Sequence, residues 1–193
     1  MKLLHLDSSA LGANSVTREL SAAIVARWQD AVPGLTVDYR DLDTNPLPHL
    51  TGSVLTGADA VAKAEGDAAM DQFLASDVIV IGAPMYNFGV PSTLKAWIDR
   101  VAVAGKTFRY TEKGPEGLAI GKRLIVASGR GGVYGESSPA DFQEAYLRQV
   151  FGFLGISDVE FVRAEGVAYS PQHRTDALAT AHASIREPLR EAA

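Results

Sequence analysis

A run of seven residues, DVIVIGA at positions 77–83, constrains the fold of this chain more than any other feature. After Asp77 it carries no polar side chain, whereas a strand with one face in water alternates apolar and polar residues. Strands without alternation are typical of parallel sheets, because the helices that connect parallel strands cover both faces. The apolar stretch ends at Met85 and is far shorter than the roughly 20 residues of a membrane-spanning helix. It therefore predicts the central strand of an α/β domain.

Strand and helix patterns alternate along the rest of the 193 residues. Short apolar runs predict strands at residues 2–7, 35–40, 77–83, 123–128 and 158–163. Apolar residues at helical spacing predict helices at residues 15–30, 60–75, 91–101, 140–153 and 172–191. Five strands and five helices in this alternation are typical of a flavodoxin-like parallel sheet of order 2-1-3-4-5, with helices on both faces. The length suits a single domain over residues 1–193 and is too short for two.

Two segments depart from the alternation. Residues 41–60 contain the sequence NPLP, and two prolines this close forbid regular strand pairing, so we expect a loop. Residues 102–120 form a long excursion that carries Phe108, Tyr110 and a Lys-Gly-Pro turn signal.

The bulk composition excludes several classes of protein. The net charge is −5 and there is no cluster of Lys or Arg, which argues against a nucleic-acid binder. The chain has no cysteine, so disulfides, thiolate metal sites and a cysteine nucleophile are excluded, and we assign no metal site. The first residues, MKLLHLD, form too short an apolar run for a signal peptide. We therefore expect a cytoplasmic protein that does not enter the membrane.

The loop after the first predicted strand, residues 8–17, is rich in hydroxyl groups and leads into a helix; we call it the hydroxyl loop. Free backbone N–H groups, the helix dipole and the hydroxyls of Ser9, Ser15 and Thr17 could hold a phosphate there. The loop lacks the Gly-Lys-Ser/Thr of a P-loop, so a phosphate monoester is expected rather than a hydrolysed triphosphate. An ordinary helix cap formed by Asn14 or Ser15 is the alternative.

The loop after the third strand, residues 84–89, is the aromatic loop. It places Met85, Tyr86 and Phe88 where a soluble loop is normally polar, and a flat heteroaromatic ring needs such surfaces for stacking. Asn87 offers both a donor and an acceptor, which matches an N–H group beside a carbonyl on a ring edge. The alternative is a loop whose aromatic side chains are plain core.

The loop after the fourth strand, residues 129–134, is the glycine loop. It lacks the spacing of a dinucleotide fingerprint, but its glycines let the backbone approach a planar ligand and direct N–H groups at it. A flexible turn is the alternative.

In open parallel sheets the ligand lies at the carboxyl ends of the strands where the winding reverses, and all three loops belong to that edge. Their convergence is the strongest indication of a ligand site.

These residues resemble the FMN-dependent NADH azoreductases, a family that overlaps the NAD(P)H:quinone oxidoreductases. The resemblance covers essentially the whole chain, and its most specific stretches are residues 83–88, 107–112, 114–118, 130–132 and 164–169. It implies one FMN per subunit, a homodimer with both active sites at the interface, and a cytoplasmic location. The resemblance also gives the excursion a role, because exposed aromatic residues usually mark contacts. We expect Phe108 and Tyr110 at the subunit interface and in the pocket wall, with a plain surface hairpin as the alternative.

The resemblance assigns the cofactor-binding residues in two groups. It places the FMN phosphate on Ser9, Ser15, Val16 and Thr17. It places the isoalloxazine ring beside Met85, Tyr86, Asn87 and Phe88 and beside Gly129, Arg130, Gly131 and Gly132. Two positions depart from the family's pattern: Gly129 stands where a serine is common, and Val16 offers only its backbone N–H to the phosphate.

The resemblance also implies the reaction. NADH or NADPH passes a hydride to the flavin, and a quinone or azo compound then takes two electrons from the same ring face, in a ping-pong cycle. Backbone donors around Gly131 and Gly132 would stabilise the reduced, anionic ring. No acid or base is required, because solvent can protonate the product, so we assign no catalytic side chain. A 2′-phosphate of NADPH needs a cation, and Arg109, Arg130 and Arg163 are the candidates.

Two other functions are weighed against this one. A flavodoxin-type electron carrier tends to be smaller and strongly acidic, which this chain is not. A serine hydrolase is suggested by the Asp-Ser-Ser sequence at residues 7–9 and by histidines at 5, 49, 173 and 182. The chain has no Gly-x-Ser-x-Gly nucleophile elbow, however, and each histidine lies in a context typical of a structural or solvated side chain.

Overall fold

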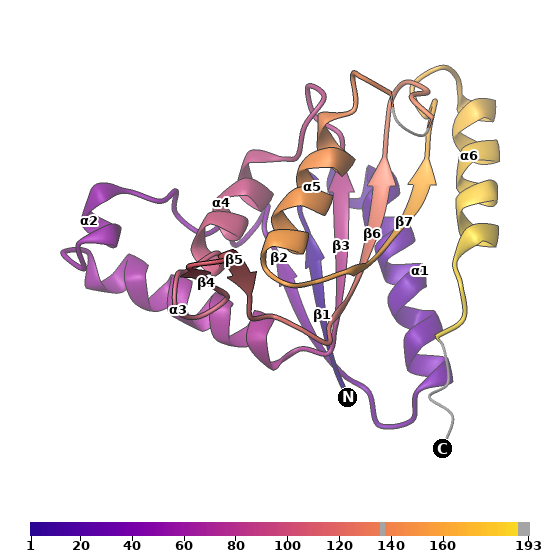
Figure 1. Cartoon of the computed structure of the whole chain (residues 1–193). Helices are drawn as coiled ribbons and strands as arrows, with labels where there is room; N and C mark the ends of the chain where they lie inside the picture. Colours follow the sequence, from indigo (N-terminus) through magenta and orange to yellow (C-terminus); the bar gives the residue numbers. More distant parts are fainter. Residues whose placement is uncertain (136–137, 189–193) are drawn as a thin grey trace.

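The computed structural model describes residues 1–135 and 138–188. Its centre is a parallel sheet of five strands in the order β2-β1-β3-β6-β7 (Figure 1). The strands are β1 (Lys2–Asp7), β2 (Thr36–Asp41), β3 (Val78–Pro84), β6 (Arg123–Gly129) and β7 (Asp158–Ala164). Counted along the chain within this sheet, the order is the predicted 2-1-3-4-5, and the flavodoxin-like α/β fold is confirmed.

Helices cover both faces of the sheet (Figure 1). On one face lie α1 (Val16–Ala31) and α6 (Pro171–Ser184); on the other lie α3 (Ala60–Ala75), α4 (Ser92–Val101) and α5 (Phe142–Phe153). A short 3-10 helix, η1 (Gly12–Asn14), precedes α1, and the expected loop at residues 41–60 contains the one-turn helix α2 (Gly52–Leu55).

The last helix ends earlier than predicted. Residues 185–188 are not helical, and residues 189–191 of the predicted helix lie outside the described part of the chain. Ile185 leaves the helix in an extended conformation and packs into the core on the α1 side. Arg27 fixes this exit by donating to the carbonyl oxygen of Ile185 at 2.6 Å.

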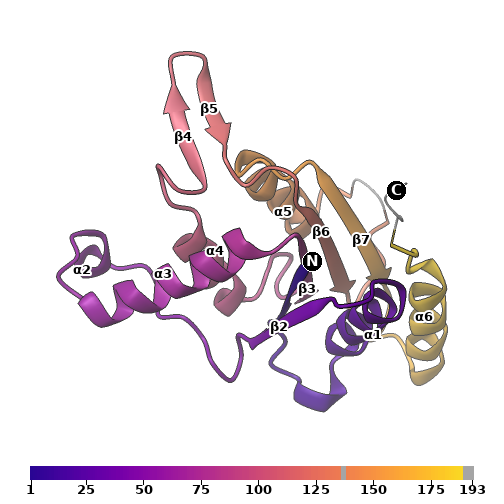
Figure 2. The ribbon, with the colours of Figure 1, turned by 90° about the horizontal axis from the view of Figure 1, so that it is seen from below.

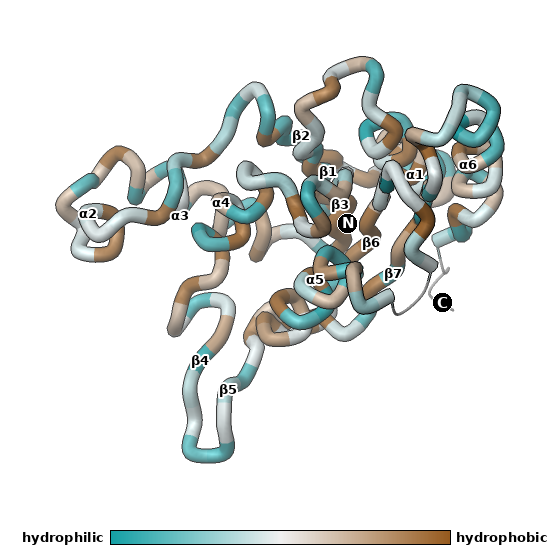
Figure 3. Tube along the Cα trace, turned by 90° about the horizontal axis from the view of Figure 1, so that it is seen from above, coloured by the Kyte–Doolittle hydropathy of each residue, from teal (hydrophilic) through white to brown (hydrophobic). Residues whose placement is uncertain are grey.

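The central strand β3 is buried along its whole length, as its sequence predicts. Its side chains alternate between the two cores. Ile79 and Ile81 belong to the cluster under α3, α4 and α5, whereas Val78 and Val80 belong to the cluster under α1 and α6. Burial of each such side chain stabilises the fold by about 1.5–3 kcal/mol. Figure 3 shows the resulting apolar band along the central strands.

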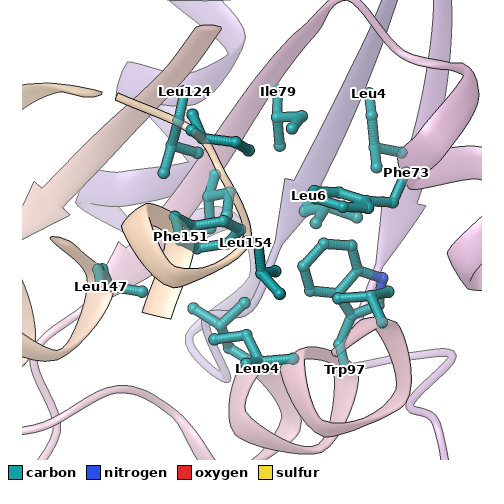
Figure 4. Packing of buried hydrophobic residues seen from close by; sticks show 14 of the residues in the cluster. Leu4, Leu6, Phe73, Ile79, Leu94, Trp97, Leu124, Leu147, Phe151 and Leu154 are labelled. Atoms are coloured by element: carbon teal, nitrogen blue, oxygen red, sulfur yellow. The ribbon is translucent and has the colours of Figure 1, made fainter. Parts of the chain in front are cut away.

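Aromatic packing closes the larger core (Figure 4). Trp97 of α4 is fully buried and meets Phe73 of α3 edge to face, with 5.8 Å between the ring centroids. Phe151 of α5 packs against the same Phe73 at 6.5 Å. These contacts hold three helices on one face of the sheet. They also fix the positions at which α4 and α5 begin, beside the carboxyl edge of the sheet.

The excursion at residues 102–120 forms an antiparallel hairpin of β4 (Phe108–Thr111) and β5 (Gly114–Gly117). It projects away from the body of the domain (Figure 2). Its base is anchored, because Phe108 packs on Phe153 at 4.5 Å between ring centroids and the N–H of Ala119 donates to the carbonyl of Leu154 at 2.8 Å. Tyr110, farther out, is 75% exposed.

Gly82 lets α1 lie close to the end of β3. A Cβ atom at this position would lie 2.3 Å from Oδ1 of the buried Asp7 and 3.2 Å from the carbonyl oxygen of Thr17. The first contact is impossible without a shift and the second is tight, so a side chain would push Asp7 or α1 away from the sheet.

We therefore expect Gly82→Ala to lower the free energy of unfolding by about 1–3 kcal/mol, the usual cost of overpacking. Gly152→Ala is the matched control, since Gly152 is exposed in α5 and its added methyl would meet no atom within 4 Å. The control should be neutral or stabilising by up to about 1 kcal/mol. Urea denaturation followed by circular dichroism measures both, and equal stability of Gly82→Ala and the wild type would contradict this packing.

Candidate functional site

The hydroxyl loop gathers donors at the N-terminus of α1. Ser15 caps the helix, accepting a hydrogen bond from the N–H of Arg18 at 3.3 Å, and its Oγ lies 3.1 Å from Oγ1 of Thr17. The N–H groups of Val16 and Thr17 lie in the first turn, where a helix offers them no acceptor. Two hydroxyls and two unpaired N–H groups at the positive end of a helix form a cradle for an anion.

Arg18 holds this loop from behind. Its Nε and Nη2 donate to the carbonyl oxygen of Ser9 at 3.2 and 2.8 Å, while Nη1 and Nη2 donate to the two carboxylate oxygens of Asp41 at 2.8 and 2.7 Å. Sequence reasoning missed Arg18. A cation in the first turn of a helix interacts unfavourably with the helix dipole. Its presence in the sequence could have indicated an acidic partner nearby.

The aromatic loop contains a strained two-residue turn. Tyr86 and Gly89 exchange two backbone hydrogen bonds of 3.1 and 3.0 Å, and both residues between them have positive φ, 49° at Asn87 and 70° at Phe88. These angles are typical of a type I′ turn, which favours Asn and Gly but is costly for a bulky residue such as Phe. The strain holds the Phe88 ring 51% exposed at the edge of the sheet, and such outliers cluster at ligand sites.

The glycine loop is supported by residues 164–169. The carbonyls of Arg130, Gly131 and Gly132 accept hydrogen bonds from Val167, Ala168 and Gly166 at 3.1, 3.2 and 2.9 Å. The N–H groups of Gly131 and Gly132, by contrast, donate to no acceptor within residues 1–135 and 138–188. The loop is therefore fixed through its carbonyls, with two adjacent N–H donors left over.

Direct contacts join the three loops. Oγ of Ser9 lies 3.3 Å from the Tyr86 hydroxyl, which also accepts from the N–H of Ala10 at 3.2 Å. The N–H of Met85 donates to the carbonyl of Gly129 at 2.8 Å, and this bond connects the aromatic and glycine loops. All twelve predicted cofactor-binding residues thus belong to one connected edge at the carboxyl ends of β1, β3 and β6.

Two predicted positions contribute their backbone only. The Val16 side chain is buried in the core, leaving its N–H as the group available to a ligand. The Arg130 side chain is fully buried and ion-paired with Asp141, Glu144 and Glu165 at 2.8, 2.5 and 3.1 Å. It points away from the loop surface.

Gly129 lies against the first turn of α1. A Cβ at this position would lie 2.8 Å from Cγ2 of Thr17 and 3.5 Å from Cγ1 of Val16. A serine would therefore crowd the first turn of α1, and glycine at 129 fits the Val-Thr sequence of this chain.

The candidate cations for a 2′-phosphate have carboxylate partners. Arg109 lies 2.8 Å from Glu116 in the hairpin, Arg163 donates to Glu144 at 2.6 and 2.9 Å, and Arg130 is buried as described.

The geometry does not support a serine hydrolase. Ser9 faces Tyr86, and Oγ of Ser8 donates to the carbonyl of Gly82 at 2.7 Å. The Ser–His contact at 2.8 Å between Ser170 and His173 belongs to the exposed cap of α6. Within the described ranges no group of three His, Asp or Glu side chains could hold a metal ion, and no helix there is long and apolar enough to span a membrane.

The Arg18–Asp41 pair makes a prediction about acid stability. The two hydrogen bonds from Arg18 hold the pKa of the Asp41 carboxyl below its ordinary value. The pair therefore stabilises the fold above about pH 4, and this contribution is lost as the pH falls further.

Asp41→Asn should lower the free energy of unfolding at about pH 7, and its deficit relative to the wild type should shrink towards about pH 3. Asp38→Asn, at an exposed position of the same strand, should follow the wild type. Chemical denaturation at both pH values measures the free energy of unfolding. If Asp41→Asn were destabilised by the same amount at both pH values, the result would contradict the ion pair.

Comparison with known proteins supports the fold over nearly the whole chain. A family model described as flavodoxin-like fold matches residues 1–189. The FMN-dependent NADH:quinone oxidoreductase of Stenotrophomonas maltophilia (strain K279a) is 66% identical over 185 residues, covering 96% of this chain and 94% of that protein. The azoreductase from Bacillus anthracis str. Sterne has a TM-score of 0.88 at 30% identity, over 96% of both chains.

A second azoreductase structure contains FMN. The FMN-dependent NADH-azoreductase from Bacillus anthracis str. Ames Ancestor, solved in complex with FMN, has a TM-score of 0.87 at 26% identity, over 95% of both chains. These similarities extend over nearly the whole chain and confirm the resemblance inferred from its sequence. The chain is an oxidoreductase enzyme and belongs to the family of FMN-dependent NADH:quinone oxidoreductases.

Proposed function

We propose that this enzyme binds FMN across its three carboxyl-edge loops and uses NADH to reduce quinones and azo compounds. The proposal rests on the contacts that join the three loops at the carboxyl edge of the sheet. Three features lie at adjacent strand ends: the anion cradle, the exposed aromatic turn, and the N–H groups of Gly131 and Gly132. They suit the phosphate, the ring face and the ring edge of FMN, respectively.

The phosphate end of FMN is assigned to the hydroxyl loop. Ser15, Thr17 and the N–H groups of Val16 and Thr17 are its donors, and Ser9 adds a hydroxyl on the side of the aromatic loop. Hydrogen bonds to a charged group contribute about 1.5–3 kcal/mol each. The phosphate therefore provides much of the affinity for the cofactor.

The ring end is assigned to the aromatic and glycine loops. Met85, Tyr86, Asn87 and Phe88 line one side of the isoalloxazine, and the backbone of residues 129–132 lines the other. When bound, FMN supplies the two-electron hydride chemistry. The N–H groups of Gly131 and Gly132 would stabilise the negative charge of the reduced ring, because fixed donors do so without reorganisation.

NADH is the proposed donor in preference to NADPH. The relative at 66% identity is named for NADH, and Arg109, Arg130 and Arg163 are engaged with carboxylates. NADH and the acceptor occupy the same ring face in turn. No side chain is assigned as a catalytic acid or base, because solvent can supply the protons.

We further propose that the enzyme is a cytoplasmic homodimer in which the hairpin is an interface element. A projecting hairpin with Tyr110 exposed is unfavourable in an isolated subunit. An apolar hollow of about 500 Å³ lies between α4 and α5, beside the aromatic loop. An exposed aromatic side chain and an apolar hollow on one chain suit a two-fold assembly, since a symmetric dimer can place each of them in the contact on both subunits.

The function is tested by single-turnover kinetics under anaerobic conditions. The FMN-loaded protein should lose its yellow colour on mixing with NADH and regain it when 1,4-benzoquinone or the azo dye methyl red is added. NADH should give the higher kcat/KM when compared with NADPH. A protein that binds FMN but stays reduced in the presence of both acceptors would rule out the proposed reaction.

The dimer is tested with Tyr110→Asp. A charge at an apolar interface is costly, so this variant should elute as a monomer in light-scattering chromatography where the wild type elutes as a dimer. Leu55→Ser is the control, because Leu55 is 72% exposed in α2, away from the hairpin. A dimeric Tyr110→Asp variant would show that the hairpin tip is no part of the interface.

A further inference from the structure

Arg130 lies in the glycine loop, yet its side chain does not reach the loop surface. The guanidinium is fully buried, although Arg130 directly precedes Gly131 and Gly132, whose N–H groups find no acceptor among the described residues. A buried guanidinium is expensive unless its charge is balanced and its donors are used. Here the donors are used by Ser128, Asp141, Glu144 and Glu165, and Gln143 is joined to Arg130 through Ser128. We call these five side chains the Arg130 network.

One branch of the network reaches the aromatic loop. Nε of Arg130 donates to Oγ of Ser128 at 3.1 Å, and Ser128 donates to Oε1 of Gln143 at 2.9 Å. Nε2 of Gln143 then donates to the carbonyl of Ala83 at 3.0 Å, just before the aromatic loop begins. All these atoms are buried, so the chain of bonds fixes the end of β3 relative to the glycine loop.

A second branch reaches the far end of the glycine loop. Oε1 of Glu165 accepts from Arg130 at 3.1 Å and also from the N–H groups of Tyr134 and Gly135 at 3.1 and 3.2 Å. The Tyr134 ring in turn meets the exposed Phe88 ring edge to face, at 6.4 Å. The guanidinium thus connects, through Glu165 and Tyr134, to the Phe88 side chain of the proposed ring site.

A third branch fixes the start of α5 and balances the charge. Asp141, which caps α5, and Glu144 both accept from Arg130, and Glu144 is also paired with Arg163. Among the described residues, Arg130 pairs with all three carboxylates of the network, and Arg163 and Arg148 also pair with Glu144. Without Arg130 the region behind the glycine loop would become more negative, which would oppose reduction of a ligand.

We propose that Arg130 is a positioning residue that sets the affinity and the reduction potential of the flavin from behind the ring site. It does so by holding the Gly131 and Gly132 N–H groups in place and by balancing the carboxylates of Asp141, Glu144 and Glu165. The proposal rests on the function proposed above, in that the ligand is FMN. It assigns no contact between the guanidinium and the cofactor.

The experiment compares Arg130→Met and Arg130→Lys with the wild type. Binding of FMN to the apoprotein is followed by flavin fluorescence, and the midpoint potential is measured by a dye-coupled spectroscopic titration. Arg130→Met should weaken FMN binding by about tenfold or more, the loss of one strong buried ionic contact, and should make the potential more negative. Arg130→Lys, which keeps the charge but loses the fork of donors, should recover part of the potential.

Arg123→Met is the matched control. Arg123 begins β6, the strand that leads into the glycine loop, and it is paired with Glu160 at 2.6 Å at the end of the strand far from that loop. Its removal should cost stability but leave the potential unchanged. An Arg130→Met protein with the wild-type potential and affinity would overturn the proposal, as would an equal shift in Arg123→Met.

Glu165→Gln keeps the proposal testable even if Arg130→Met fails to fold. It retains the shape of the side chain and removes one negative charge, so the potential should move in the positive direction, opposite to that of Arg130→Met. A negative or absent shift in Glu165→Gln would contradict the electrostatic part of the proposal. If the wild type itself bound no FMN, the proposed function would fail instead, and the two failures are therefore distinguishable.

Discussion

Burial of β3 on both faces is the constraint on which the rest of this structure depends. Ile79 and Ile81 pack under three helices and Val78 and Val80 under two, so neither face of the strand is available to a ligand. A sheet covered in this way can present polar groups only where its strands end. Functional residues are therefore confined to loops at one edge, and parallel pairing brings the loops of β1, β3 and β6 together there.

Those loops need support, because short polar segments cannot fix themselves. Two arginines provide it from inside the domain: Arg18 holds the carbonyl of Ser9, and Arg130 joins the glycine loop to Ala83 and to residues 134–135. Both are neutralised by carboxylates, and the Arg130 guanidinium is fully buried. The strained turn at Phe88 depends on this rigid frame, since a flexible loop would relax to ordinary backbone angles.

The sequence predicts the sheet, the order of its strands and the three loops, because apolar periodicity and glycine or proline punctuation act locally. It does not predict the direction of the Arg130 side chain, since its partners Asp141, Glu144 and Glu165 come from two later segments. The resemblance places Gly129 beside the flavin ring, and its proximity to Thr17 could be learned only from the approach of α1 to β6. Long-range contacts of this kind leave no local pattern.

The central claim is that the hydroxyl loop binds the phosphate of a flavin whose ring lies on the other two loops. The most direct measurement is calorimetric titration of the apoprotein with FMN and with riboflavin, which differ in that phosphate alone. Two or more charge-assisted hydrogen bonds should make FMN bind at least about 100-fold more tightly, and Thr17→Val should weaken FMN without affecting riboflavin. Equal affinity for the two flavins would contradict the account.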